Sequence, residues 1–294
     1  MSEESQGTRL NKYLASCGIG SRRACDALIQ EGGIYVNNSI CIKPATRVDS
    51  DDVVRVGRKI VTPKTTEVLL FNKPPGLVCT SSDELGRETI YHILPPHLRH
   101  LKNVGRLDKE SEGLLVLTND GDLALKLTHP RQKVEKEYIV TLNQAFSNEV
   151  IEKLLSGVHT PEGRARAKSI RRISPRRVSV ILETGLKRQI RYMFDAVHLK
   201  VTKLVRVRIG LLQGGGLELG SWRQLEADEI VALQLNPKPR NTPAGVKRAI
   251  QKGSEARKTA RKSNSKPARK SARKITSRKP ARKAAKKVFR RKGK

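Results

Sequence analysis

The sequence has little of three things: cysteine, long apolar runs and, in its last fifth, acidic residues. It holds four cysteines among 294 residues, with no C-x-x-C pair and no histidine at metal-ligand spacing. No apolar run approaches the roughly 20 residues that a membrane helix needs, and the N-terminal MSEESQGTRL has no apolar signal segment. We therefore expect a cytoplasmic protein with no membrane partner, no disulfide framework and no metal site.

Positive charge is concentrated at the C-terminal end. Of the formal net charge of +32, residues 237–294 carry +23, because they hold 24 Lys and Arg against one acid, Glu255, and this leaves +9 on residues 1–236. The same segment repeats Ala-Arg-Lys units and has almost no apolar periodicity. Such a composition cannot bury enough surface to fold alone, so we predict a disordered tail that binds nucleic acid nonspecifically through its charge.

Residues 8–62 have the pattern of a small module of helices and short strands. A short helix is expected over 9–15, a second helix begins after Ser21 as its N-cap, and strands follow at 34–36, 39–42 and 52–56. Basic residues fall on polar positions of the helices and of a following loop: Arg9, Lys12, Arg22, Arg23, Lys43 and Arg47. The charges alone are compatible with a solvated face or with a surface that binds nucleic acid.

The stretch RLNKYLASCGIGSRRACDALIQEGGIYVN closely resembles the alpha-L RNA-binding motif, the small domain first named after the fourth small-subunit ribosomal protein. This resemblance implies that the six basic residues bind structured RNA.

The segment 66–236 begins with an expected strand at 68–71 that ends in Asn72-Lys73-Pro74-Pro75-Gly76. The two prolines and the glycine predict a stiff turn from which Lys73 projects.

The run GRLDKESEGLLVLTNDGD places Asp108 in a polar loop between two apolar segments, at 104–107 and 114–118. An aspartate after a strand is usually a turn or cap residue, although loops between core strands also carry catalytic groups. Further along, 136–141 alternates as a strand that contains Tyr138, 144–157 has helical spacing, and TGLKRQIRYMF opens as a loop and becomes a helix that contains Arg191.

The GRLD run, the K-x-Y strand and the R-Q-I-R helix resemble the three active-site elements of the bacterial rRNA pseudouridine synthases related to RsuA and RluB. The resemblance extends over about residues 8–236. Within the family, the RluB type, which acts on the large subunit, is the one most similar in the stretch KPPGLVCTSSDELGRETIYHILP. Two positions depart from the pattern: Thr184 replaces a frequent Glu, and Tyr192 replaces a frequent Arg.

The resemblance implies an α+β protein with three parts: the RNA-binding module at 8–62, a catalytic domain at 66–236 with a mainly antiparallel sheet, and the tail. It implies isomerisation of a uridine in ribosomal RNA, with Asp108 as nucleophile, Tyr138 beneath the flipped base and Arg191 paired with Asp108. Lys73 would line the cleft and bind RNA, and Arg106 would help displace or replace the flipped nucleotide.

One carboxylate suffices for this chemistry, so no cofactor or metal is expected. The expected partner is ribosomal RNA or a ribosomal subunit precursor, and we expect a monomer. A catalytically idle RNA-binding assembly factor is the main alternative, but it would tolerate loss of the three active-site residues. A nucleic-acid-compacting protein would explain the tail and leave residues 1–236 without a role.

Overall fold

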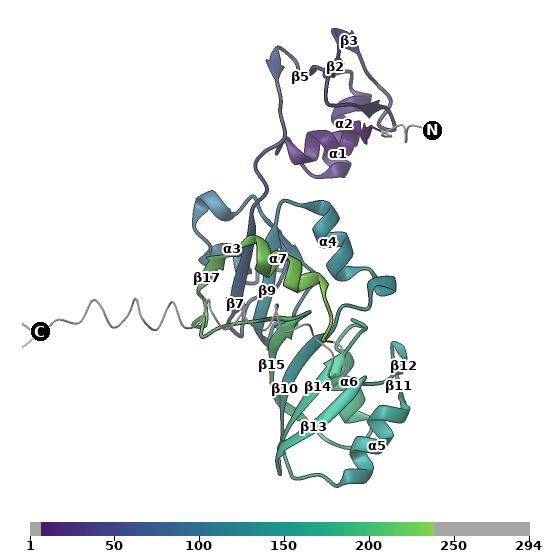
Figure 1. Cartoon of the computed structure of the whole chain (residues 1–294), viewed down its shortest axis with the longest axis vertical. Coiled ribbons are helices and arrows are strands. Elements are labelled where there is room, and N and C mark those ends of the chain that lie inside the picture. Colours follow the sequence, from purple (N-terminus) through teal and green to yellow (C-terminus); the bar gives the residue numbers. More distant parts are fainter. Residues whose placement is uncertain (1–6, 238–294) are drawn as a thin grey trace, which may run out of the picture. The chain divides into compact units, whose positions relative to one another are not determined.

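The computed structural model describes residues 7–237 (Figure 1). The predicted basic tail lies outside the described residues, apart from Pro237. Four hydrophobic cores form within the described part: one among residues 10–61, and three among residues 68–233. None of the helices described is long and apolar enough to cross a membrane.

The N-terminal elements pack around the first of these cores. The Ser21 hydroxyl accepts a hydrogen bond from the Ala24 amide (3.1 Å) and caps the second helix as predicted, and Asn37 and Asn38 both have positive φ in the turn between two strands. The third predicted strand begins two residues later than expected, at Val54. The Asp52 carboxylate accepts hydrogen bonds from the Asn37 side chain and the Asp49 amide, and these bonds hold residue 52 in a turn. The elements are β1 (Thr8–Arg9), α1 (Leu10–Ser16), α2 (Arg22–Gln30), β2 (Ile34–Val36), β3 (Ser39–Ile40), β4 (Arg47–Val48), β5 (Val54–Val56) and β6 (Lys59–Ile60).

A nine-stranded sheet organises the rest of the described chain. Its main path is β13-β14-β10-β15-β9-β7-β17, with β16 beside β15 and β8 beside β9. All pairs are antiparallel except β15 with β9, so the mainly antiparallel sheet is confirmed. The strands are β7 (Val68–Lys73), β8 (Lys102–Val104), β9 (Glu112–Thr118), β10 (Lys136–Leu142), β13 (Ser169–Ser174), β14 (Arg177–Leu182), β15 (Val201–Ile209), β16 (Leu212–Gln213) and β17 (Trp222–Gln224), with a separate hairpin of β11 (Val158–Thr160) and β12 (Gly163–Ala165).

Seven helical segments accompany this sheet. Those of α type are α3 (Ile90–Ile93), α4 (Gly121–Thr128), α5 (Asn148–Ser156), α6 (Gln189–Asp195) and α7 (Ala227–Gln234), and the two 3₁₀ turns are η1 (Pro96–Leu98) and η2 (Pro130–Gln132).

Strands β7 and β9 are covered on both faces. Val68 and Leu70 of β7 lie in a core with residues of α4 and α7, whereas Leu69 and Phe71 lie in a second core with residues of α3. Side chains of a strand alternate between faces, so a strand covered on both sides is apolar throughout. This explains why every residue of β9 is buried.

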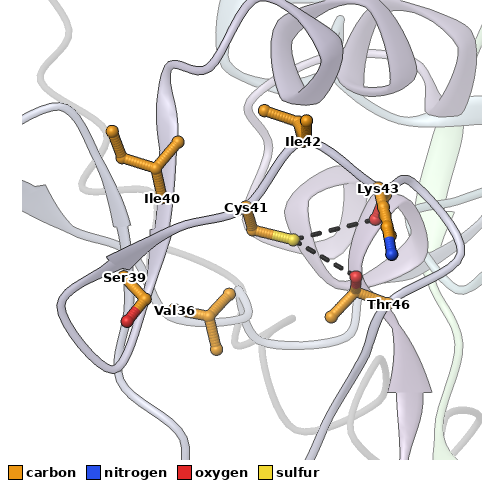
Figure 2. Close-up of a pocket in the computed structure, with 7 residues that line it drawn as sticks. All are labelled: Val36, Ser39, Ile40, Cys41, Ile42, Lys43 and Thr46. Atoms are coloured by element: carbon orange, nitrogen blue, oxygen red, sulfur yellow. Dashed lines mark hydrogen bonds between the residues drawn. The ribbon is translucent and has the colours of Figure 1, made fainter.

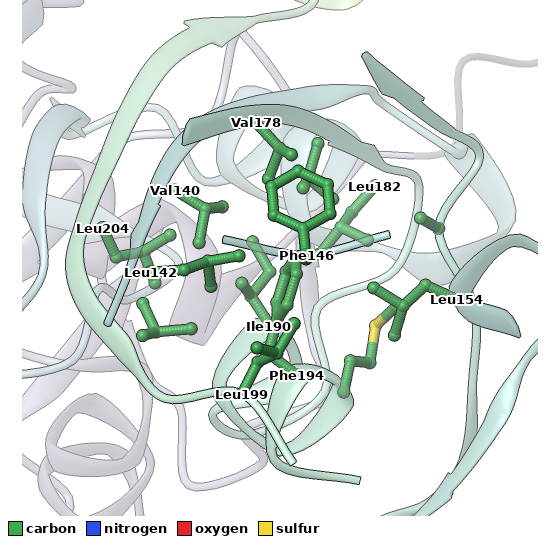
Figure 3. Packing of buried hydrophobic residues seen from close by; sticks show 14 of the residues in the cluster. Val140, Leu142, Phe146, Leu154, Val178, Leu182, Ile190, Phe194, Leu199 and Leu204 are labelled. Atoms are coloured by element: carbon green, nitrogen blue, oxygen red, sulfur yellow. The ribbon is translucent and has the colours of Figure 1, made fainter. Parts of the chain in front are cut away.

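The other half of the sheet packs on α5 and α6, and Figure 3 shows its core side chains, among them Val140, Phe146 and Phe194. The helix expected over 144–157 begins at Asn148. Phe146 is buried against this core with the Arg172 guanidinium 4.1 Å from its ring centroid, and the helix begins two residues after it.

Candidate active site

The loop that follows β8 presents Asp108 from a buried anchor. Gly105 turns the chain with φ +70°, and Leu107 is buried in the core beside α3, where its amide faces the Cys79 sulfur at 3.5 Å. Asp108 itself keeps 27% of its side chain exposed. The carboxylate therefore reaches solvent from a backbone that is fixed immediately before it.

Lys73 is buried, and the prediction that it projects from its turn to bind RNA is wrong. Its side chain is 0% exposed, and its ammonium donates hydrogen bonds to the carbonyl oxygens of Pro74 (2.9 Å), Lys109 (3.1 Å) and Ser111 (2.9 Å). Three acceptors use all three donors of a lysine, and none is left for a phosphate.

The Lys73 ammonium thus holds the loop that carries Asp108. Two of its acceptors belong to that loop, and the Gly76 amide also donates to the Lys109 carbonyl (2.8 Å). Burial lowers the pKa of Lys73, while Cys79 and the neighbouring carboxylates Glu110 and Asp108 oppose that shift.

Arg191 reaches the same loop from α6. Its Nε lies 3.8 Å from Asp108 Oδ2, its Nη1 donates to the Val201 carbonyl (3.2 Å), and its Nη2 faces the Glu110 carbonyl (3.5 Å). Burial and then the nearby Arg188 lower the pKa of Arg191, and Asp108 raises it. The Arg191 Nε forms an ion pair with the carboxylate but has no hydrogen-bond partner within the described chain, so it can move closer to a charge that develops there.

Tyr138 lies in β10 between two hydrophobic cores. It is half-buried and packs against the core of α5 and α6 and against the core beside α3, the one that anchors Leu107. A ring held by two cores with part of its surface exposed is a firm platform for a flat ligand.

Arg206 is a buried neighbour of this site that the sequence analysis did not single out. It lies opposite Tyr138 in the register with β10 and opposite Gly113 in the register with β9, and it is 3% exposed. Its Nε donates to the Leu114 carbonyl (2.5 Å), while its Nη2 is buried with no partner among the described residues. A side chain at Gly113 would overlap the Arg206 backbone, and therefore this glycine is required. The signal in the sequence was an arginine among the apolar residues of KLVRVRIG.

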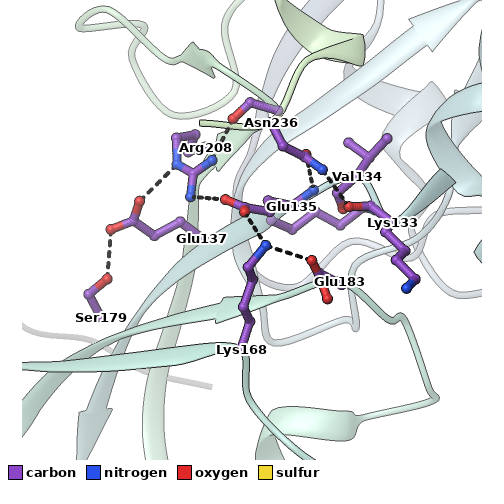
Figure 4. Close-up of polar contacts among 11 residues, drawn as sticks. Lys133, Val134, Glu135, Glu137, Lys168, Ser179, Glu183, Arg208 and Asn236 are labelled. Carbon is purple, nitrogen blue, oxygen red and sulfur yellow. Dashed lines mark hydrogen bonds and ion pairs between the residues drawn. The ribbon is translucent and has the colours of Figure 1, made fainter. Parts of the chain in front are cut away.

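A second polar cluster fixes the start of β10 (Figure 4). Arg208 donates to Glu135 (3.1 Å) and to Glu137 (2.9 Å), and Lys168 contacts Glu135 at 2.8 Å. Lys136 lies between Glu135 and Glu137 in the sequence, and burial lowers its pKa to about 8. Through Glu137, the cluster ties β10 to β15 one residue before Tyr138.

The six basic residues of the N-terminal module remain on its surface. Arg9, Arg22, Arg23, Lys43 and Arg47 are exposed, and Lys12 is half-exposed with its ammonium 2.7 Å from the Asp122 carboxylate. Exposed ion pairs of this kind contribute little to stability. Arg106 is likewise exposed, directly before Leu107.

Comparison with known proteins gives this arrangement a class. The family described as RNA pseudouridylate synthase matches residues 67–196, and the S4 domain matches residues 8–54. A crystal structure of a pseudouridylate synthase aligns with a TM-score of 0.57 at 27% identity, covering 77% of this chain and all of that one. The fold and the matched families define an RNA-modifying isomerase with an S4 domain.

Individual relatives show which family of pseudouridine synthases the chain belongs to. The dual-specificity RNA pseudouridine synthase RluF of Salmonella typhi is 35% identical over 270 residues, which cover 86% of this chain and 92% of the relative. Ribosomal large subunit pseudouridine synthase B of Bacillus subtilis is 33% identical over 233 residues, 77% of this chain and 95% of the relative. The protein of the same name in Pseudomonas aeruginosa is 35% identical over 271 residues, 87% of this chain and 70% of the relative. The chain belongs to the RsuA family of RNA pseudouridine synthases, alongside RluF and RluB.

Proposed function

We propose that the protein converts one uridine of large-subunit ribosomal RNA to pseudouridine in the cytoplasm, with Asp108 as the nucleophile. One observation carries the proposal: two cations hold the loop that presents the accessible Asp108 carboxylate. The buried Lys73 ammonium donates to two carbonyl oxygens of this loop, and the Arg191 guanidinium lies 3.8 Å from the carboxylate oxygen. Two relatives carry the name ribosomal large subunit pseudouridine synthase B, which supports RNA of the large subunit as the substrate.

The reaction needs a carboxylate at the sugar. Attack of Asp108 on the anomeric carbon breaks the bond to the ring nitrogen and gives an ester between the ribose and the carboxylate, as in retaining glycoside hydrolases. The freed uracil rotates, its C5 carbon forms the new bond to the anomeric carbon, and the carboxylate leaves. The C5 proton is lost and the ring nitrogen gains one, so the product is an isomer of the substrate.

Tyr138 and Arg106 serve the flipped nucleotide in this proposal. Extruding a base costs roughly a few kcal/mol, and stacking on an aromatic ring returns about 1–3 kcal/mol. Tyr138 supplies that ring from between its two cores, and the exposed Arg106 replaces the base in the RNA stack. The module at 8–62 docks the surrounding structured RNA through its six surface cations.

The test is a single-turnover assay with rRNA that carries tritium at C5 of uridine, because bond formation at C5 releases that hydrogen. The Asp108→Asn variant should bind the RNA and release no tritium. Asp195→Asn, which removes an exposed carboxylate from α6, is the matched control and should react like the wild-type protein. Tritium release by Asp108→Asn at the wild-type rate would exclude Asp108 as the nucleophile. A wild-type protein that binds rRNA and releases none would favour the catalytically idle alternative.

A further inference from the structure

The outer face of the N-terminal four-stranded sheet carries a row of side chains that the hydrophobic core does not use. The sheet order is β3-β2-β5-β6, and the registers pair Ile40 with Tyr35, Tyr35 with Arg55, and Arg55 with Ile60. Directly opposed residues of antiparallel strands point to the same side. These four side chains therefore form one row across all four strands, which we call the sheet row.

The sheet row is open to solvent, and its two ends are apolar. Ile40 and Ile60 are each 60% exposed. Ile34 and Val54, which precede Tyr35 and Arg55 in their strands, are buried in the core on the other face. Isolated exposed isoleucines are common, but Ile40 lies directly beside the Tyr35 ring, and Ile60 adds a second apolar side chain on the far side of Arg55.

The centre of the sheet row combines an aromatic ring with a cation. The Arg55 guanidinium lies 5.4 Å from the centroid of the Tyr35 ring, and both residues are half-buried. Arg55 Nε is shielded from water and has no hydrogen-bond partner in the part of the chain that the structure describes. Stacking on Tyr35 rather than hydrogen bonding thus positions this side chain, so its outer nitrogens can meet an acceptor.

A shallow hollow adjoins the sheet row at Ile40 (Figure 2). Its volume is about 300 Å³, and its lining includes Val36, Ile42 and Lys43 besides Ile40. That volume is at the lower end of pockets that hold small organic molecules. Val36 follows Tyr35 in β2 and packs against the core, so the hollow lies at the edge of the sheet beside β3 and meets the sheet row only at Ile40. Lys43 also belongs to the surface that the sequence predicts to bind RNA, so the hollow borders that surface as well.

We propose that the sheet row and its hollow bind unpaired bases of the RNA substrate, as a second contact on elements other than the two helices. Flat bases suit a strip of tyrosine, arginine and isoleucine, because stacking on such side chains needs no particular sequence. The charged members, Arg55 and Lys43, are cations, and no carboxylate lines the row or the hollow, which favours a polyanion over a protein partner or a second copy. The inference rests on the proposed function only in taking RNA as the partner.

The experiment compares Kd values of the full-length protein for a single-stranded RNA dodecamer and for the same sequence as a duplex, each over a range of salt concentrations. Tyr35→Leu removes the ring and keeps an apolar side chain, and it should weaken single-strand binding by roughly 5-fold to 150-fold, the worth of one stacked base. Binding to the duplex should change by less than about 2-fold. Tyr35→Phe should retain wild-type affinity for both. Because stacking is not ionic, the loss should persist as salt rises.

Two variants that each lose one positive charge distinguish a specific contact of Arg55 with RNA from general electrostatic attraction. Arg55→Gln and Arg58→Gln each remove one charge, but Arg58 lies in the exposed turn after β5 and outside the sheet row. Arg55→Gln should weaken single-strand binding several times more than Arg58→Gln does. Thermal unfolding of each variant within a few degrees of wild type would show that the module remains folded.

Two results would overturn the inference. In one, Tyr35→Leu binds the single strand as tightly as the wild-type protein does, as expected if this face meets a protein instead. In the other, Tyr35→Leu loses the single strand and the duplex equally. Both readouts are binding constants, so they do not depend on Asp108. Loss of catalysis in Asp108→Asn together with unchanged binding by Tyr35→Leu would refute the inference and leave the proposed function standing.

Discussion

Replacing Lys73 by methionine separates its structural role from the RNA-binding role that the sequence predicts. Methionine fills similar space without a donor, so the carbonyl oxygens of Pro74, Lys109 and Ser111 lose their partner. A hydrogen bond to a charged group contributes about 1.5–3 kcal/mol, and removing the buried ammonium offsets part of that loss. We expect a net destabilisation of about 2–4 kcal/mol, or a fall in Tm of roughly 5–15 °C for a chain of this size.

The larger effect should fall on catalysis. Two of the three acceptors lie in the loop that carries Asp108, so this loop loses the two hydrogen bonds that fix its backbone to Lys73. A displacement of about 1 Å at a reacting group costs on the order of 100-fold in rate. Lys73→Met should therefore lower the single-turnover rate at saturating RNA about 100-fold and leave Kd for RNA nearly unchanged.

The assay pairs tritium release with salt titrations of RNA binding, and Lys102→Met, which removes an exposed lysine from β8, is the control. A phosphate-binding lysine would behave in the opposite way: its loss would weaken binding and flatten the slope of log affinity against log salt by about 0.7–0.9. A Lys73→Met protein with a normal rate, weaker binding and a flatter slope would refute the structural role.

Three further predictions follow from the site and the charge distribution. Arg191→Ala should lower kcat roughly 10²- to 10³-fold, with partial recovery in Arg191→Lys, because a cation beside Asp108 is lost; equal rates for both variants would argue against an electrostatic role. The pKa of Lys136 is about 8 in the folded protein against 10.5 ordinarily, so the unfolded chain binds more protons between these values. The free energy of unfolding of the wild-type protein, measured by urea denaturation, should therefore rise with pH over that window relative to that of Lys136→Met. The same pH dependence in both proteins would contradict the lowered pKa. A protein ending at Asn236 should isomerise the same uridine with a flatter salt slope and weaker binding to unrelated RNA, and unchanged slopes would show that residues 237–294 do not bind by charge alone.

Local chemistry made several features predictable from the sequence. Ser21 caps a helix because its hydroxyl reaches an amide three residues on, and the Asn37-Asn38 pair suits a turn with positive φ. The apolar run of β9 predicts a strand covered on both sides. These signals involve neighbours in sequence, so no knowledge of the fold was needed.

The burial of Lys73 could not be predicted in this way. Two of its acceptors lie 36 and 38 residues away, and a lysine after a strand is ordinarily a surface residue. The same holds for Arg206, which owes its burial to β9 and β10 packed on either side of β15. The approach of Arg191 to Asp108 came from the family resemblance, and the roles of Asp108, Tyr138 and Arg191 in catalysis remain predictions.

The central claim is tested most directly by mapping pseudouridines in ribosomal RNA from three strains: wild type, a deletion of this gene, and the deletion complemented with Asp108→Asn. We predict a pseudouridine in large-subunit RNA that is present in the wild type and absent from both other strains, with the Asp108→Asn protein present at normal levels. Identical maps in all three strains, or restoration of the pseudouridine by Asp108→Asn, would contradict the account.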